Sequence, residues 1–214
     1  MSERPQALLD TIRQIVRDEL ARVQGATLAI VEELHAGKGE YACTVALRDS
    51  RLVLKRVPIA TARMGLAAIP AVDDLVLVQF INGDINRPVI VGSLYNDEDP
   101  PPANGDTQWV GQLPLGAGDG SGVSLLAKGA DPPSLTLAIG GALTLTLQDD
   151  DPVVAIDVAS GSATLTIESD GTIALKGSRG LAIEAGGDLE LKGANVKIEG
   201  SGEVAVKGSV INLN

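Results

Sequence analysis

The sequence predicts a mainly β protein in which a short N-terminal helix precedes a small five-stranded barrel and a repetitive β-stalk. Two observations support this class. Apolar residues change from helical spacing to strand-like alternation near residue 25, and apolar pairs recur every seven or eight residues toward the C-terminus. The 214 residues include 25 Gly but only one Phe, one Trp and two Tyr, so small aliphatic side chains must supply the core.

A single N-terminal helix is predicted over residues 5–24, within a first segment of residues 1–25. Pro5 suits the first turn of this helix, and Gly25 suits the residue after its C-terminus. The apolar residues on one side of this helix leave two arrangements open: packing against the helix's own domain, or contact with symmetry-related copies or a second protein. The apolar positions at helical spacing are Leu8, Leu9, Ile12, Ile15, Val16, Leu20 and Val23.

Residues 26–98 are predicted to form a small OB-type barrel. Five strand-like segments are separated by turn-forming residues, and Asn82-Gly83 is a strong signal of a tight hairpin. A longer excursion over residues 55–72 separates the third strand from the fourth, as a five-stranded Greek-key OB barrel requires. The predicted strands span residues 27–31, 41–47, 52–54, 75–80 and 87–92.

The three consecutive prolines 100–102 predict a break after the barrel, because proline lacks the N–H that a sheet requires. Residues 99–134 are predicted to be a Pro- and Gly-rich linker and the start of the stalk. Trp109 is expected to anchor this linker against the barrel or the first coil of the stalk. Residues 135–214 are predicted to form the repetitive β-stalk itself.

The stalk prediction rests on apolar pairs separated by glycines. Less regular strands begin near Leu135, Leu143, Val153 and Leu165, and the clearest pairs follow from Ile173 onward. Their first members lie 8, 8, 7, 8 and 7 residues apart, a short period typical of a β-solenoid or fibrous β-prism. We expect the first five of these pairs to form the core of the stalk. The pairs are Ile173/Leu175, Leu181/Ile183, Leu189/Leu191, Val196/Ile198, Val204/Val206 and Ile211/Leu213.

Each repeat offers only two apolar side chains for seven or eight ordered residues. The free energy gained by burying these two side chains is smaller than the entropic cost of ordering the backbone of the repeat. Several copies around one axis would add ladder hydrogen bonds and close every strand edge. The pattern therefore favours an oligomer and leaves the number of copies open.

The charge excludes some function classes. The chain carries a formal net charge of -11, and residues 103–214 contribute -8 of it (14 acidic, 6 basic residues). An OB protein that binds nucleic acid would need a basic groove and stacking aromatics, so no nucleic-acid partner is expected. The N-terminus lacks the basic-then-apolar order of a signal peptide, and no apolar run approaches about 18 residues, so neither a signal peptide nor a transmembrane helix is expected.

No catalytic, cofactor or metal site is predicted, and the chain is not expected to be an enzyme. His35 is the one histidine, and no phosphate-binding glycine loop precedes a helix. The acidic runs 97–99 and 149–151 are interpreted as surface loops, because Ca²⁺ needs six or more converging oxygens. Cys43 alternates with apolar neighbours and is expected in the core.

Residues 69–97 combine a proline before an acidic turn, a strand ending in Phe, a Gly-Asp hairpin, a Pro-Val strand and a Tyr-Asn exit. This set resembles the OB domain of phage baseplate assembly protein V and the VgrG spikes. The order of helix, barrel, proline exit and β-repeat is similar to that family over nearly the whole chain. The matching residues are Pro70, Asp73, Val76, Val78, Phe80, Gly83, Asp84, Pro88, Val89, Gly92, Tyr95 and Asn96.

The resemblance implies a homotrimer whose barrel joins a baseplate hub protein to an intertwined trimeric β-helix, or β-prism. Such a chain is the structural central spike of a contractile tail or injection system. It is assembled in the bacterial cytoplasm, carried in the baseplate of a virion or injection particle, and pierces the target envelope, touching the membrane only transiently. The resemblance is equally compatible with a phage tail, a type VI system and an extracellular injection system.

The chain departs from some members of that family at two points. It has no room for a lysozyme domain, and it lacks the C-terminal His-Xaa-His that binds iron in some phage spikes. A separate tip protein of the PAAR type is therefore expected at the C-terminal end. The predicted docking residues are Val210, Ile211, Asn212, Leu213 and Asn214.

The alternative function is a receptor-binding tail fibre or stalk with an OB module. A fibre should present aromatic or loop-rich recognition surface at its distal end. This sequence ends in plain repeat, which favours the spike.

Overall fold

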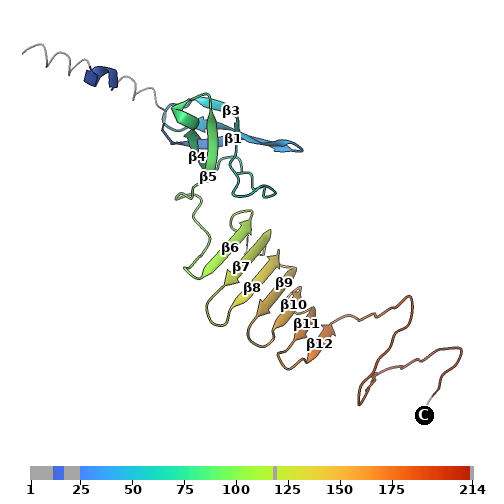
Figure 1. Cartoon of the computed structure of the whole chain (residues 1–214). Coiled ribbons are helices and arrows are strands. Elements are labelled where there is room, and N and C mark those ends of the chain that lie inside the picture. The colour runs from blue at the N-terminus through green and yellow to red at the C-terminus, as the bar shows by residue number, and fades with distance from the viewer. Residues whose placement is uncertain (1–11, 17–24, 118–119, 213–214) are drawn as a thin grey trace, which may run out of the picture. The chain divides into compact units, whose positions relative to one another are not determined.

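The computed structural model describes residues 12–16, 25–117 and 120–212, and the chain divides into two compact units, Met1–Gly105 and Asp106–Asn214 (Figure 1). Residues 12–16 are helical and exposed. The rest of the helix predicted over residues 5–24 lies outside the described residues. No helix among the described residues is long and apolar enough to cross a membrane.

The first unit contains a five-stranded antiparallel sheet in the order β3-β2-β1-β4-β5. A bridge between Ile59 and Ile90 joins the end of β3 to β5, and the Ala60 amide donates to the Ile90 carbonyl at 2.8 Å. These contacts close the sheet into the small OB-type barrel that the strand order predicts. The strands are β1 (Thr27–Gly37), β2 (Glu40–Leu47), β3 (Val53–Pro58), β4 (Leu75–Phe80) and β5 (Pro88–Ser93).

All five predicted strands are present, but β1 is six residues longer than predicted, and β3 runs to Pro58, four residues into the predicted excursion of residues 55–72. Glu32 and Glu33 interrupt the apolar alternation, and for this reason the sequence predicted that the strand ends at residue 31. The residues from Glu33 to Gly37 pair with the first half of β2, where Leu34 lies opposite Cys43 and Gly37 opposite Glu40, and the register shifts between Val31 and Glu33. Such a bulge adds one residue to the strand and so breaks the period of two on which the prediction depended.

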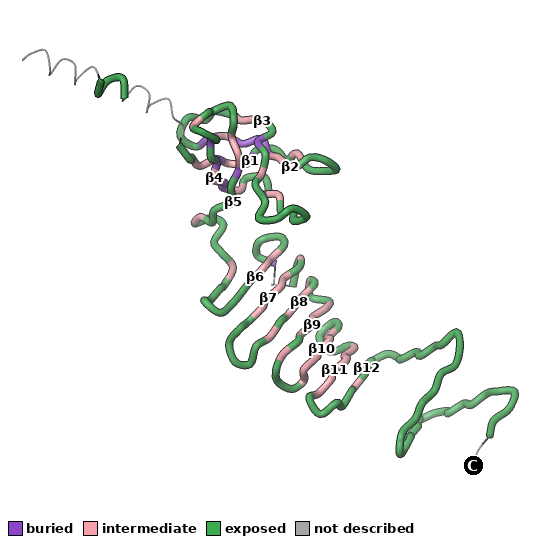
Figure 2. The backbone as a smooth tube through the Cα atoms, in the orientation of Figure 1, coloured by how far each residue is buried: buried purple, intermediate pink, exposed green. Residues whose placement is uncertain are grey.

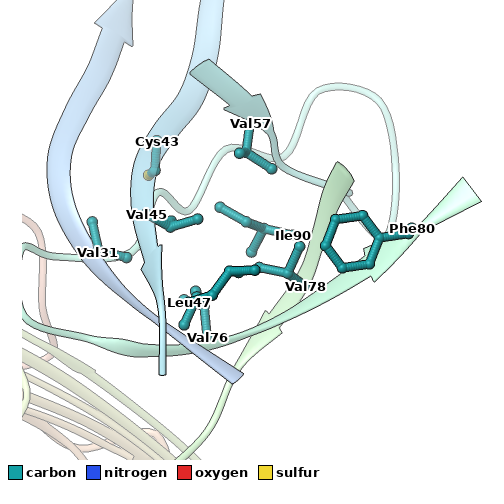
Figure 3. Packing of buried hydrophobic residues seen from close by; sticks show 10 residues of the cluster. Val31, Cys43, Val45, Leu47, Val57, Val76, Val78, Phe80 and Ile90 are labelled. Carbon is teal, nitrogen blue, oxygen red and sulfur yellow. The ribbon is translucent and has the colours of Figure 1, made fainter. Parts of the chain in front are cut away.

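The barrel encloses the main hydrophobic core of the described chain, and Figure 3 shows its side chains converging from β1 to β5. The core contains the predicted Cys43, which is fully buried; burial, and then the negative charge of Asp74, raise the pKa of its thiol. The thiol therefore stays protonated and unreactive at neutral pH. The core residues are Ala29, Val31, Cys43, Val45, Leu47, Val57, Val76, Val78, Phe80 and Ile90.

The predicted hairpin at Asn82-Gly83 is confirmed between β4 and β5. Asn82 and Gly83 both have positive φ, 55° and 73°, within the short 3-10 turn η1 (Ile81–Gly83). Asparagine and glycine are the residues that accept this left-handed backbone at least cost.

The connection between β3 and β4 is a fixed loop that carries apolar side chains into solvent. The Tyr41 hydroxyl accepts a hydrogen bond from the Ala68 amide at 3.1 Å and donates to the Ala68 carbonyl at 3.0 Å. The Thr61 hydroxyl donates to the Leu66 carbonyl at 3.0 Å. The loop nevertheless leaves Met64 almost fully exposed and Leu66 well exposed.

The second unit contains a seven-stranded sheet in which every strand pairs with the next along the chain (Figure 1). All of these pairs are antiparallel, and none carries a register shift. The strands are β6 (Gln108–Leu113), β7 (Val123–Lys128), β8 (Ser134–Ile139), β9 (Leu143–Gln148), β10 (Val154–Val158), β11 (Ala163–Ile167) and β12 (Ile173–Gly177).

Strands β8 to β12 begin within two residues of the predicted starts near Leu135, Leu143, Val153, Leu165 and Ile173. Strands β6 and β7, by contrast, lie inside residues 99–134, where the sequence predicted a linker and only the start of the stalk. The sheet therefore begins earlier than the regular repeat does.

Residues 178–212 leave β12 without regular secondary structure in the single chain (Figure 1). The Ser178 amide still donates to the Ser162 carbonyl at 2.8 Å, which ties the first residue of this segment to the sheet. The pairs from Leu181 onward fall in this segment, except for Leu213, which lies outside the described residues, so the β-helix predicted for them stays a prediction.

Candidate functional site

The seven-stranded sheet separates its side chains into two chemically different faces. Residues directly opposite each other across a strand pair share a face, and neighbours along a strand alternate between faces. Because the register is unbroken from β6 to β12, each face consists of straight rows that cross the strands. The rows can therefore be taken directly from the pairing.

One face is apolar at every position. Its middle row is Gly111, Leu125, Leu137, Leu145, Ile156, Leu165 and Leu175. One outer row is Leu113, Val123, Ile139, Leu143, Val158, Ala163 and Gly177. The other outer row is Trp109, Ala127, Leu135, Leu147, Val154, Ile167 and Ile173.

The opposite face is suited to water. Threonines gather in its central rows, at Thr136, Thr146 and Thr166 in one row and Thr144 and Thr164 in the next. Other positions on this face carry Gln, Ser, Lys and Asp, with a few small or aliphatic side chains between them. The sheet is therefore amphipathic, as expected of a sheet that covers a core on one side only.

Within the described part of the second unit, nothing covers the apolar face. Among the described residues of the second unit, Ala117 alone is a fully buried apolar residue, and Ala117 lies in a turn outside the strands. Figure 2 accordingly shows intermediate burial along β6 to β11 and full burial almost only in the five-stranded unit. Leu113 is 75% exposed and Ile173 is 67% exposed. An uncovered apolar face of this extent marks an interaction surface.

Trp109 lies at the β6 end of this apolar face. Its indole lies over Gly111, two residues along the same strand, where an added Cβ would be 3.2 Å from the Trp109 ring carbon Cη2. Glycine at residue 111 thus leaves room for the ring to lie over the first position of the middle row. Trp109 is still 60% exposed, so a partner surface can cover it.

The predicted stalk-core residues split between two environments. Ile173 and Leu175 lie on β12, in the outer and middle rows of the apolar face. The others lie in residues 178–212 and are more than half exposed in the single chain. These are Leu181, Ile183, Leu189, Leu191, Val196, Ile198, Val204 and Val206.

Two ion pairs follow the same alternation in residues 178–212. Glu190 Oε1 and Lys192 Nζ are 2.8 Å apart, and the corresponding atoms of Glu199 and Lys197 are 2.7 Å apart. Each pair joins residues two positions apart, which places both charges on one side of an extended chain. The apolar residues of the repeat occupy the alternate positions. The inward and outward positions proposed below follow this alternation.

The C-terminal residues proposed for tip docking are only partly described. Val210 is 75% exposed and Ile211 is about half exposed, while Leu213 and Asn214 lie outside the described residues. Asn212 is also exposed. Among the described residues of this end, Val210 is thus mostly uncovered and Ile211 about half covered.

Other candidate sites carry little chemistry. An open cavity of about 470 Å³ lies in the first unit. Its lining has no nucleophile paired with a general base. The lining residues are Ile30, Arg48, Leu75, Asn96, Asp97 and Glu98. The His35 Nε2 lies 2.8 Å from the Thr44 hydroxyl, beside Glu33, and this contact fastens the ribbon of β1 and β2. Among the described residues, no three His, Cys, Asp or Glu side chains are grouped to hold a metal ion.

The apolar positions of β6 and β7 are the functional residues that the sequence pattern missed. The alternation in Val123, Leu125 and Ala127 was present, but Leu126 on the opposite face obscured it. Gly111 and the prolines around β6 weakened the signal further.

Comparison with known families bears on the first unit. Residues 48–95, which contain β3, β4 and β5, match the type VI secretion system/phage-baseplate injector OB domain. No curated protein matches the chain. The resemblance carried by residues 69–97 is confirmed, and the match supports a structural, baseplate-related role within an injection particle or virion.

Proposed function

We propose that this chain, which resembles the injector OB domain over residues 48–95, is the central spike of a contractile tail or injection system. In this proposal three copies assemble around one axis, and the shaft that they form pierces the target cell envelope. The chain acts mechanically and performs no catalysis. The uncovered apolar face of the seven-stranded sheet is the observation that carries the proposal, because further copies of the chain would cover it.

The dimensions of the sheet favour three copies. A strand of five residues is about 17 Å long, so three sheets closed into a triangular prism each lie about 5 Å from the axis. That is half of the roughly 10 Å spacing between packed sheets, so leucine-sized side chains from three faces meet at the centre. Four sheets would lie about 8 Å from the axis and leave a central hole.

The middle row of the apolar face would then point at the axis, and its two outer rows would fill the corners. The polar, threonine-rich face would form the outer surface. Residues 178–212 would continue the shaft as an intertwined β-helix, in which the partner chains supply the ladder hydrogen bonds that one chain lacks. In such a shaft the strands lie across the axis, so free strand edges remain only at its two ends.

The barrel would connect the shaft to a baseplate hub protein. The loop between β3 and β4 supports such a contact, since hydrogen bonds from Tyr41 and Thr61 hold it while Met64 and Leu66 project into solvent. A fixed loop that exposes large apolar side chains is typical of a protein contact. The alternative, a receptor-binding fibre, has no such observation in its favour.

Purified full-length protein is expected to be a trimer of about 66 kDa, three times the 21.9 kDa of the chain. Multi-angle light scattering measures this mass directly and independently of shape. A stable folded monomer or dimer would contradict the proposed spike. Electron microscopy of the purified trimer should also show a straight, narrow shaft, whereas a flexible shaft with a knobbed end would favour the fibre.

The C-terminal end is proposed as the docking site of a separate tip protein of the PAAR type. Deleting residues 209–214 should leave the trimer intact, because the sheet and the earlier repeats remain, but it should abolish capture of that tip protein. Electron microscopy of intact particles carrying either chain measures density beyond the shaft. A full-length particle whose apex is bare β-helix would contradict this docking proposal.

A further inference from the structure

The turns of the seven-stranded sheet fall into two rows, one along each side of the sheet. Because all strands are antiparallel neighbours, successive turns alternate between the two sides. The turns after β7, β9 and β11 lie on one side, and the turns after β6, β8 and β10 lie on the other. The two rows differ strongly in charge.

The first row, here named the acidic turn row, comprises residues 129–133, 149–153 and 168–172. It carries six carboxylates and no Lys or Arg, and most of its side chains are exposed. The carboxylates belong to Asp131, Asp149, Asp150, Asp151, Glu168 and Asp170.

The second row, here named the small turn row, comprises residues 114–122, 140–142 and 159–162. The last two of its turns, Gly-Gly-Ala and Ala-Ser-Gly-Ser, have no charge and no side chain larger than serine. Asp119 is the single charged residue of the row and lies outside the described residues. Backbone can approach these turns closely, since their side chains are short.

Hydrogen bonds join successive turns within each row. In the small turn row, the Gly140 amide donates to the Gly122 carbonyl at 2.7 Å and the Ala159 amide donates to the Ala142 carbonyl at 2.9 Å. In the acidic turn row, the Asp149 amide donates to the Pro133 carbonyl, and the Ser169 amide donates to Asp151 Oδ1 at 2.7 Å. Among the described residues, neighbouring turns of each row are therefore joined to one another by hydrogen bonds.

We infer that the acidic turn row of each copy lies against the small turn row of the next copy around the axis. This inference rests on the trimer proposed above and assigns its contacts. A rotation axis brings unlike edges of identical sheets together, so every corner of the prism receives one row of each kind. The interface is head-to-tail and closes after three copies.

The heights of the turns along the rotation axis also fit this contact. A pure rotation keeps each strand at the same height along the axis, and a turn lies at the height between its two strands. The turn after β9 of one copy therefore lies between the turns after β8 and β10 of the next copy. The carboxylates of residues 149–151 would insert between Gly-Gly-Ala and Ala-Ser-Gly-Ser, where the Ser160 hydroxyl and the amides of Gly141 and Ser160 can donate hydrogen bonds to them.

The separation of charge also removes a repulsion. If both edges of the sheet were acidic, each corner would hold two facing rows of carboxylates. With one acidic row per corner, the three rows lie about one strand length, or roughly 17 Å, apart. That distance is about twice the Debye length of roughly 8 Å at physiological ionic strength, so the rows scarcely repel one another.

Short-range cross-linking tests this inference. The variant Asp150→Cys/Ser160→Cys places thiols in opposite rows, at turns that would be adjacent between copies but stand a full strand apart within one chain. A bismaleimide with a spacer of two carbons should convert it to covalent dimers and trimers on a denaturing gel. The native Cys43 is buried and does not interfere.

The variant Asp150→Cys/Asp170→Cys is the matched control, because both of its thiols lie in the acidic turn row. It should give no cross-link between copies at the same protein concentration. If light scattering reports a trimer but Asp150→Cys/Ser160→Cys gives no cross-link between copies, the inferred corner is wrong while the trimer stands. If light scattering reports a monomer, the proposed function fails instead.

Discussion

Replacing Leu145 with aspartate is expected to abolish the trimer. Leu145 lies at the centre of the middle row of the apolar face, which in the proposed prism points at the axis. The substitution would place three carboxylates at one level of an apolar core, and each buried charge costs several kcal/mol before their mutual repulsion is counted. Light scattering should show loss of the species of about 66 kDa, in favour of monomer or irregular aggregate.

Thr146→Asp is the control for this prediction, because it introduces the same charge one residue away on the opposite face. Thr146 lies opposite Thr136 and Ala155, so a carboxylate there meets no like charge across the strands and stays in water. This variant should stay trimeric. Trimers formed equally well by both variants would mean that the apolar face does not meet the axis, and loss of assembly in both would mean that β9 tolerates no charge on either side.

The first unit could be predicted from sequence almost strand by strand. Its turns use residues with a local reason to be there, such as Asn82 and Gly83 at positive φ, and its core alternates with period two in β2 and β4. The end of β1 could not be predicted. The register shift between Val31 and Glu33 breaks the period of two there, and Glu32 and Glu33 remove the apolar signal.

The second unit was predictable only where its repeat is regular. Leu135 and Leu137, or Leu143 and Leu145, give clear pairs, and the strands lie there. Strand β6 has Gly111 where the other strands carry a middle-row side chain, and Trp109 covers that gap from two residues away. Such compensation depends on packing, which a period in the sequence does not record.

The sequence predicted that the candidate site is an apolar surface, but it did not predict how far along the chain that surface extends. The sequence indicated inward-facing pairs from Ile173 onward, whereas the apolar face extends back to Trp109. The separation of the turns into an acidic and a small row could not be seen in the sequence alone, because it depends on which side of the sheet each turn lies. That assignment follows from the antiparallel order of β6 to β12.

Replacing Leu189 with aspartate is expected to leave the sheet assembled but to prevent the chain beyond it from folding. In one chain, residues 178–212 have no strand partner, so their order in the trimer must come from neighbouring copies. A charge at Leu189 removes the apolar contact that would compensate for the entropy of ordering this segment. Hydrogen–deuterium exchange should show residues 178–212 protected in the unaltered trimer and exchanging as fast as unstructured peptide in Leu189→Asp, with residues 106–177 protected in both.

Glu190→Lys is the matched change on the other side of the extended chain. It removes the ion pair with Lys192, but the two side chains are 71% and 80% exposed, and an exposed pair of this kind contributes about 0–1 kcal/mol. Protection of residues 178–212 should therefore persist in this variant. If Glu190→Lys lost protection while Leu189→Asp kept it, the inward and outward positions of the repeat would be reversed. If both kept it, residues 178–212 would have to be ordered by something other than an apolar axis.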